Sequence, residues 1–387
     1  MSRWIGRIGT ILAIASLFGG LARGDEPELA RLREHVEILA SREFAGRRDE
    51  GAAKARAYLI AEFRRLGLEP LFGGSYTQDV TGKGLGDVLG VNVGAKIPGA
   101  DPGLGDRWVI LGAHYDHLGR RGDVIFPGAD DNASGVAMML EVARCLAGSP
   151  EKPARGVAFV GFDLEEMGPK GEFGLRGSQF FCRNPPVPLD RVGLFVTADM
   201  IGRSLGGVCD PYVFVLGSER EPIVRPWIER ASKGRPVKVG LLGSDIPAID
   251  RSDYGPFRSR KIPYLFFTTG ENPLYHSPRD VAGTLDYPKL EAISRIIGAV
   301  VAEAARSRAE PTWTEPPDHP IAEALTLRDI FKILLDHRQD LKIGGFPVAL
   351  MNHAIRTVDG VAERGVMTPD ERTRIIRAAQ VVLFTVF

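Results

Sequence analysis

Cysteine is scarce in this chain, and its scarcity excludes a disulfide scaffold. The 387 residues include three cysteines, Cys145, Cys182 and Cys209. An odd number means that not all of them can pair within the chain. Cys145 lies on the apolar face of a helical pattern, where cysteine behaves as a small hydrophobic residue. Cys182 and Cys209 would suit a bridge in an oxidising compartment, and the sequence leaves that pairing open.

Net charge is also lacking. The 49 lysines and arginines balance the 49 aspartates and glutamates, and no basic run or heptad repeat occurs. We therefore expect neither nucleic acid nor an anionic membrane surface as a partner. After residue 24 no apolar run approaches the roughly 20 residues that span a bilayer. The composition, 44% hydrophobic and 25% charged, is that of a globular protein with ample core material.

The N-terminus has the features of a secretory signal peptide. Arg3 and Arg7 precede the apolar run Ile8–Phe18, and Ala22–Gly24 supplies small residues near a cleavage site. The apolar run is too short for a membrane anchor. We expect residues 1–24 to be removed and the protein to be exported, either to a periplasm or to the medium, with no stable membrane anchor afterwards.

Strands and helices alternate through most of the chain. Two amphipathic helices are expected within residues 25–70 and two strands within residues 76–97. Further strands are predicted at Val109–Ala113, Val157–Phe162, Leu194–Ala198, Tyr212–Leu216 and Tyr264–Thr268, and helices at Ser134–Leu146, Gly174–Phe181, Ile223–Ser232 and Pro288–Arg306. Strands that are apolar on both faces and separated by helices are typical of a covered sheet. The sequence predicts a three-layer α/β/α sandwich with a central mixed, mostly parallel sheet.

A proline-rich segment, Glu310–Pro317, separates this region from the rest of the chain. Its composition predicts a linker at residues 311–317, between an α/β domain (25–310) and a C-terminal extension (318–387). Helical patterns in the extension cover Ile321–Leu341, Pro347–Thr357 and Pro369–Val386. No pattern there carries recognisable chemistry, so the role of the extension is left open.

Side chains with metal-binding chemistry lie at the ends of predicted strands or, in the case of Asp130 and Asp131, directly before a predicted helix. They are His114, Asp116, Asp130, Asp131, Glu165, Glu166, Asp199 and His276. Open α/β sheets place such residues together at the carboxyl ends of their strands. Imidazole and carboxylate groups without thiolate suit zinc or a similar divalent ion in a hydrolytic site. The set is larger than one tetrahedral ion needs, which favours two ions that share a carboxylate.

Some of these residues also have a simpler interpretation. Asp130 or Asp199 would fit a helix cap, although a metal ligand is favoured for Asp199. His117 adjoins the pattern and is expected only to line the site. The pair Glu165-Glu166 would fit a solvated acidic surface, but it directly follows an apolar strand. On an extended strand end the two side chains point apart, so one can bind metal while the other acts as general base.

The motifs that carry these residues occur in a familiar order. They are His-Tyr-Asp-His-Leu-Gly (114–119), Gly-Ala-Asp-Asp-Asn-Ala-Ser-Gly (128–135), Phe-Asp-Leu-Glu-Glu-Met-Gly (162–168), Ala-Asp-Met-Ile-Gly (198–202), Ser-Asp-Tyr-Gly-Pro-Phe (252–257) and Tyr-His-Ser-Pro-Arg-Asp (275–280). Taken together, they resemble the di-zinc aminopeptidases of metallopeptidase family 28, which include bacterial leucyl aminopeptidases and aminopeptidase Y. The resemblance extends from about His35 to Ile297.

The resemblance implies a metal site of five ligands for two zinc ions. His114 and Asp199 would bind one zinc ion, Glu166 and His276 would bind the other, and Asp131 would bridge both. It also implies a cis peptide bond directly after Asp131. The implied activity is the hydrolysis of N-terminal residues from peptides that have a free N-terminus.

Two further residues receive roles from the same resemblance. Glu165 would be the general base that takes a proton from the metal-bound water and passes it to the leaving amine. Asp116 would orient the ligating imidazole of His114. The chain departs from the family at Tyr254, where a histidine is frequent, and at Ile249, where some members have a tyrosine that assists the oxyanion. Tyr254 and Tyr275 are the candidates to replace that group.

Two alternatives remain at this point. A related acyltransferase of the glutaminyl cyclase type keeps a similar ligand set but works with one zinc ion. A non-catalytic binding module of peptidase-like fold would have lost its ligands, whereas all five positions and Glu165 are filled here.

Overall fold

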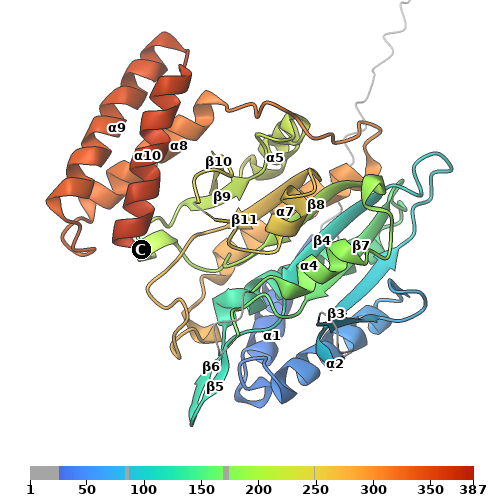
Figure 1. Cartoon of the computed structure of the whole chain (residues 1–387). Helices are drawn as coiled ribbons and strands as arrows, with labels where there is room; N and C mark the ends of the chain where they lie inside the picture. Colours follow the sequence, from blue (N-terminus) through green and yellow to red (C-terminus); the bar gives the residue numbers. More distant parts are fainter. Residues whose placement is uncertain (1–25, 83–86, 169–173, 248) are drawn as a thin grey trace, which may run out of the picture.

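The computed structural model describes residues 26–82, 87–168, 174–247 and 249–387 (Figure 1). The predicted signal peptide lies outside the described residues. Within the described part, no helix combines the length and the apolar character needed to cross a bilayer.

Within the residues that the structure describes, a nine-stranded mixed sheet forms the centre of the molecule. Its strands are β1 (Glu69–Pro70), β2 (Thr77–Thr81), β3 (Val88–Ile97), β4 (Trp108–His114), β7 (Gly156–Phe162), β8 (Val192–Ala198), β9 (Tyr212–Leu216), β10 (Lys238–Leu242) and β11 (Tyr264–Thr268). The order is β1-β3-β7-β4-β8-β11-β9-β10, and β2 also pairs with β3. The central strands β7, β4, β8 and β11 are parallel, and antiparallel pairings flank them at β3/β7 and β11/β9.

Helices cover both faces of the sheet (Figure 1). On one face lie α1 (Leu29–Leu39), α2 (Glu50–Arg65), α3 (Gly135–Gly148), α5 (Arg225–Ser232) and α7 (Tyr287–Arg306). On the other lie α4 (Arg176–Arg183), α6 (Tyr254–Arg258), α8 (Ile321–Asp336) and α10 (Pro369–Val386), with α9 (Gly345–Arg364) packed against α8 and α10. In β11, Leu265 and Phe267 join the first core while Phe266 joins the second. This alternation is the period of two expected for a strand buried on both faces.

Smaller elements complete the fold. They are the hairpin β5 (Gly119–Arg121) and β6 (Val124–Phe126), the π-helical turn η2 (Ala129–Ser134), and the 3₁₀ turns η1 (Arg42–Phe44), η3 (Leu189–Arg191), η4 (Leu205–Gly207), η5 (Pro222–Val224) and η6 (Ala282–Thr284).

The predicted α/β/α arrangement is confirmed, and most predicted elements occur close to their expected bounds. The first C-terminal helix was expected to reach Leu341, but α8 ends at Asp336, and α9 is longer than the pattern over 347–357. Strand β10, the hairpin β5–β6 and α6 were not predicted. Most of strand β10 is not buried, so it lacks the pattern of apolar residues that predicts a strand. Helix α6 contains Gly255 and Pro256, so it lacks the apolar spacing that predicts a helix. Cys182 and Cys209 are both buried and are not joined by a disulfide.

The C-terminal helices pack directly on the sheet. At Gly240 of β10 an added Cβ would lie 2.6 Å from Cγ2 of Thr326 in α8, so the glycine permits this close approach. Arg372 of α10 donates to Asp245, after β10, at 2.7 and 2.8 Å, and to Glu323 of α8 at 2.7 and 2.9 Å. The unit α8–α10 is therefore fixed to the sheet by both apolar packing and ion pairs.

Candidate metal centre

The carboxyl ends of the central parallel strands bring the predicted site residues together. His114 is the last residue of β4, and Asp199 follows the neighbouring strand β8. Glu165 and Glu166 lie three and four residues after β7, on the other side of β4. His276 comes from the loop after β11, which pairs with β8. Because these strands run in the same direction, their carboxyl ends lie side by side, and the site residues that follow them come together there.

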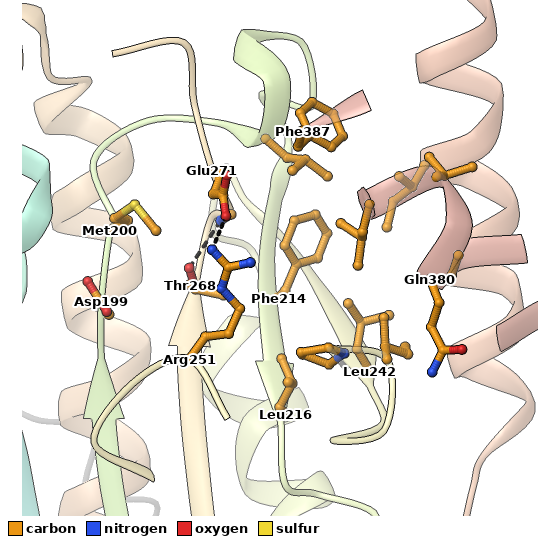
Figure 2. Close-up of a pocket in the computed structure, with 18 of the residues that line it drawn as sticks. Asp199, Met200, Phe214, Leu216, Leu242, Arg251, Thr268, Glu271, Gln380 and Phe387 are labelled. Carbon is orange, nitrogen blue, oxygen red and sulfur yellow. Dashed lines mark hydrogen bonds and ion pairs between the residues drawn. The ribbon is translucent and has the colours of Figure 1, made fainter. Parts of the chain in front are cut away.

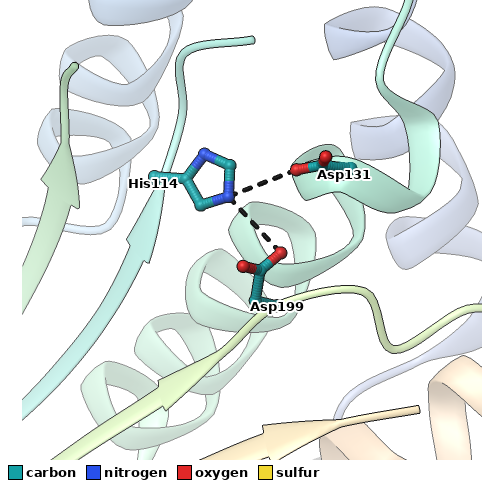
Figure 3. Close-up of side chains that lie close together, drawn as sticks. All are labelled: His114, Asp131 and Asp199. Atoms are coloured by element: carbon teal, nitrogen blue, oxygen red, sulfur yellow. Dashed lines mark ion pairs between the residues drawn. The ribbon is translucent and has the colours of Figure 1, made fainter. Parts of the chain in front are cut away.

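One cluster is formed by His114, Asp131 and Asp199 (Figure 3). The Nε2 atom of His114 lies 3.3 Å from Oδ1 of Asp131 and 3.4 Å from Oδ1 of Asp199. All three side chains are buried. Figure 3 shows both carboxylates directed at the same ring nitrogen.

A second cluster uses the other oxygen of Asp131. Nε2 of His276 lies 3.1 Å from Oδ2 of Asp131 and 3.2 Å from Oε2 of Glu166. The carboxylate of Asp131 thus faces His114 with one oxygen and His276 with the other. All five predicted ligands meet in one place, and Asp131 stands between two groups of them.

The backbone around Asp131 is held by buried charges. The peptide bond between Asp131 and Asn132 is cis, as the resemblance implied. The carboxylate of Asp280 accepts hydrogen bonds from the backbone N–H of Asp130 (2.9 Å) and of Asp131 (3.2 Å). Arg203 donates to the same carboxylate at 2.7 Å. Asp280 lies four residues after His276, so it ties the loop of one ligand to the loop of another.

Arg47 supports the same turn. Its guanidinium is completely buried and donates to five backbone carbonyls, those of Leu39, Tyr115, Pro127, Gly128 and Asp131. Burial lowers the pKa of Arg47, although the carboxylates of Asp131 and Asp280 oppose this effect. The segment Phe44–Arg47 lies between α1 and α2, and its arginine fixes the turn that carries Asp131.

Asp116 orients the Glu165-Glu166 pair. Its carboxylate accepts hydrogen bonds from the backbone N–H of Glu165 (3.0 Å) and of Glu166 (3.3 Å). The Nδ1 atom of His114 lies 3.2 Å from the backbone oxygen of Asp116 and 3.7 Å from its carboxylate. The imidazole is therefore oriented by the Asp116 backbone, with the side chain slightly farther away.

Asp130 braces two loops. Its carboxylate accepts from the backbone N–H of Gly202 at 2.6 Å and from Nδ2 of Asn272 at 3.2 Å. The cap position of the turn η2 is occupied by Gly128. Burial raises the pKa of Asp130 to about 7, although the nearby Arg203 opposes this rise. The cap interpretation of Asp130 is therefore wrong.

His117 belongs to the second cluster, which the sequence did not indicate. It is completely buried, and its Nδ1 atom lies 2.7 Å from Oε1 of Glu166 and 3.8 Å from Oδ2 of Asp131. Its ring also contacts that of His276 edge to face, with centroids 5.8 Å apart. The only indication in the sequence was its position directly after Asp116, because the turn after β4 folds back onto the site.

Burial disfavours the charged form of two of these acids. It raises the pKa of Glu165 well above its ordinary value, with Asp199 and Glu166 adding to the rise and His114 opposing it. Burial likewise raises the pKa of Asp199. Buried carboxylates of this kind are paired with cations or bound to metals.

Several buried atoms of the site make no hydrogen bond to any described group. They include Nε2 of His114, Oδ1 of Asp199 and Nε2 of His276. They converge with the two oxygens of Asp131, and imidazole with carboxylate is a donor set that zinc accepts. The residues present therefore fit a zinc site. In a further possible metal group, Asp245, His319 and Glu323, both carboxylates already accept hydrogen bonds from Arg372.

The two candidate tyrosines lie in different places. Tyr254 is completely buried between Tyr264 and Phe266, with ring centroids 5.3 and 4.8 Å away. Tyr275 lines the cavity that opens on the metal centre, and its ring stacks on His276 at 3.8 Å. Of the two, Tyr275 is placed to contact a bound substrate.

The fold and the centre define a class, the α/β proteins with a candidate metal site of carboxylates and imidazoles at the carboxyl ends of the strands. The model of peptidase family M28 matches residues 92–301, more than half of the chain. The chain belongs to this family.

The individual relatives share only a moderate or low sequence identity with this chain. Aminopeptidase YwaD of Bacillus subtilis is 27% identical over 209 residues, which are 52% of this chain and 42% of that protein. The chain therefore spans less than half the length of this curated relative. Two solved structures share the fold at 20% identity and cover 72% of this chain. They are the LapA aminopeptidase of Legionella pneumophila (TM-score 0.55, 72% of that chain) and a glutaminyl cyclase of Porphyromonas gingivalis (TM-score 0.56, 98% of that chain).

Proposed function

We propose that the protein is a zinc-dependent aminopeptidase that binds two zinc ions and removes N-terminal residues from peptides. One observation supports this most strongly: the two oxygens of Asp131 face two separate groups of ligands. His114 and Asp199 form one group, and Glu166 and His276 form the other. A carboxylate shared in this way is the arrangement expected of a two-metal hydrolase.

The bound ions would polarise the scissile carbonyl and lower the pKa of a water molecule to about 7. Glu165 is the residue of this chain that would move protons. Its Oε2 atom lies 4.0 Å from Nε2 of His114, and its carboxylate lines the cavity without belonging to either ligand group. Asp116 holds Glu165 and Glu166 by their backbone N–H groups, which keeps the base and the ligand in fixed relation.

A digest of a peptide library tests the reaction. The zinc-loaded full-length protein should shorten peptides from the N-terminus, one residue at a time, and N-terminally acetylated peptides should resist. The products are read by mass spectrometry. Shortening from the C-terminus, or no cleavage of any peptide, would contradict the proposal.

Metal stoichiometry distinguishes an aminopeptidase from the nearest alternative, an acyltransferase of the glutaminyl cyclase type. The similar fold of a glutaminyl cyclase is the reason to test this alternative. The aminopeptidase proposal expects two zinc ions per chain and release of the first residue from a Leu-peptide. One zinc ion per chain, together with cyclisation of an N-terminal Gln peptide, would favour the acyltransferase.

We also propose that the protein is exported, because residues 1–24 have the composition of a signal peptide. Expression in a bacterial host should yield a protein outside the cytoplasm that begins near Asp25. Retention of Met1 in a cytoplasmic fraction would contradict this.

A further inference from the structure

A cavity of about 480 Å³ connects the metal centre with the C-terminal helices. At one end it is lined by Asp131, Glu165, Asp199 and His276, the acids and the imidazole described above. The other end reaches α8 and α10 (Figure 2). Ligand sites in proteins commonly measure roughly 300–1,000 Å³.

The far end of the cavity is apolar. Phe214 and Phe266 come from the sheet, Phe331 and Leu334 from α8, and Leu383 from α10. These side chains belong to or pack against the second core of the protein, so the chamber is a continuation of that core. Water in such a chamber finds few hydrogen-bond partners, so its replacement by an apolar group is favourable.

The charges on the way into the chamber neutralise each other. Arg251 and Glu271 form an ion pair that stands between Asp199 and the apolar chamber (Figure 2). Both line the cavity, and among the other described side chains that line it beyond the metal end none carries a charge. The chamber therefore offers no partner for a charged substrate side chain.

The helices that line the chamber lie outside the residues matched by the family model, which end at 301. They are nevertheless held to the site. Phe387 packs on Gly206 of η4, where an added Cβ would lie 2.6 Å from the phenyl ring, and Gly206 N–H donates to the carbonyl of Glu271 at 2.8 Å. Arg372 anchors the other end of α10 through Asp245 and Glu323.

We propose that the unit α8–α10 is a specificity element, which forms the apolar wall of the substrate cavity and selects peptides with a bulky apolar N-terminal side chain. The inference rests on the proposed aminopeptidase function and names its substrate class. The α-amine would remain at the acidic end while the side chain enters the chamber. A small side chain would leave most of the chamber unfilled, and a charged one would lose its hydration without gaining a partner.

Leu383→Trp tests the wall, because it fills part of the chamber from a half-buried position on α10. Thr385→Trp is the matched control, since Thr385 lies on the same helix, is exposed and does not line the cavity. Wild type should prefer a Leu- over an Ala-substrate in kcat/KM by at least about tenfold. Leu383→Trp should reduce that ratio at least about tenfold, whereas Thr385→Trp should keep it. Should Leu383→Trp not fold, Leu383→Ala should lower the ratio by removing wall contacts.

Binding of an alkylamine separates this inference from the proposed function. Hexylamine carries an amine and an apolar chain but has no bond to cleave. It should bind the zinc-loaded wild type at least about tenfold more tightly than ethylamine, since each buried methylene contributes a factor of about four. The difference should be lost in Leu383→Trp and kept in Thr385→Trp, as measured by calorimetry.

The outcomes are distinct. Peptide hydrolysis with unchanged Leu/Ala and amine ratios in Leu383→Trp would overturn the wall and leave the aminopeptidase standing. Absence of hydrolysis with the amine ratios as expected would overturn the aminopeptidase and support the chamber as an apolar site. Equal binding of both amines to the wild type would overturn the chamber.

Discussion

The guanidinium of Arg47 donates to the carbonyl oxygen of Asp131 at 3.1 Å, although the two residues are 84 positions apart. The same guanidinium binds the carbonyls of Pro127 and Gly128. The residue whose carboxylate faces both ligand groups is thus held through its backbone by a cation that does not line the cavity. Its position depends on the short segment between α1 and α2.

Arg47→Met should therefore destabilise the protein and weaken metal binding together. Five backbone carbonyls lose a donor in the variant, and each unsatisfied buried group costs about 1–3 kcal/mol before relaxation. We expect a loss of at least about 3 kcal/mol in the free energy of unfolding, measured in urea, and a lower zinc content after dialysis. Arg42→Met, at an exposed position of η1, is the control. Wild-type stability in Arg47→Met would contradict the supporting role.

Glu165→Gln should abolish turnover while it spares the metal ions. The change removes the proton acceptor but keeps the shape, and general base catalysis typically contributes about 10²–10⁴ in rate. Steady-state kinetics and zinc analysis measure both quantities on one sample. The exposed Glu151→Gln serves as control. If Glu165→Gln hydrolyses peptides at the wild-type rate, another residue is the base.

His117→Asn should weaken zinc binding at the second ligand group. His117 lies 2.7 Å from Glu166, and loss of a partner that orients a ligand typically lowers metal affinity by about 10–100-fold. Competition with a chelator of known affinity measures the change, and the exposed His353→Asn is the control. A variant that loses stability but keeps both zinc affinities would show that His117 serves packing alone.

Acid should loosen the attachment of the C-terminal helices. Burial alone would raise the pKa of Glu323, but His319 and Arg372 together lower it below its ordinary value. A carboxyl group whose pKa is lower in the folded state stabilises that state above its unfolded pKa of about 4.3 and loses the contribution as pH falls through the folded pKa. The pKa of Asp245 is also lowered, through Arg372 and against the effect of burial.

Arg372→Met removes this dependence. At pH 7 the variant should lose about 3 kcal/mol in unfolding free energy, because Glu323 stays buried without the arginine that balances its charge. The difference from wild type should shrink as pH falls from 5 to 3, which thermal unfolding at several pH values measures. Arg374→Met, on the exposed side of α10, is the control. A constant difference across that range would contradict the role of Glu323.

The sequence predicts the centre of this molecule well because its strands are apolar on both faces. The bounds of β9 and β11 follow from the apolar runs themselves, and ligand residues stand where those runs end. Edge elements lack that pattern. In β10 only Gly240 is buried, and the strand is held by β9 and by α8 packed on that glycine.

Contacts made across the fold are also invisible in the sequence. His117 reaches Glu166 only because the turn after β4 folds back, and Arg47 reaches Asp131 only after α1 and α2 pack on the sheet. The position of α10 beside the metal cavity depends on Arg372 and on the close contact of Phe387 with Gly206. No local periodicity encodes any of these distances.

Asp280 links the loop after β11 to the turn η2. It follows His276 by four residues, yet its carboxylate accepts the backbone N–H groups of Asp130 and Asp131. If the loop that carries His276 were exchanged for one without Asp280, the histidine would still be present, but the turn that carries Asp131 would lose the carboxylate that binds its backbone N–H groups. Anyone who exchanges loops between members of this family should therefore move residues 128–135 and 275–280 as one unit.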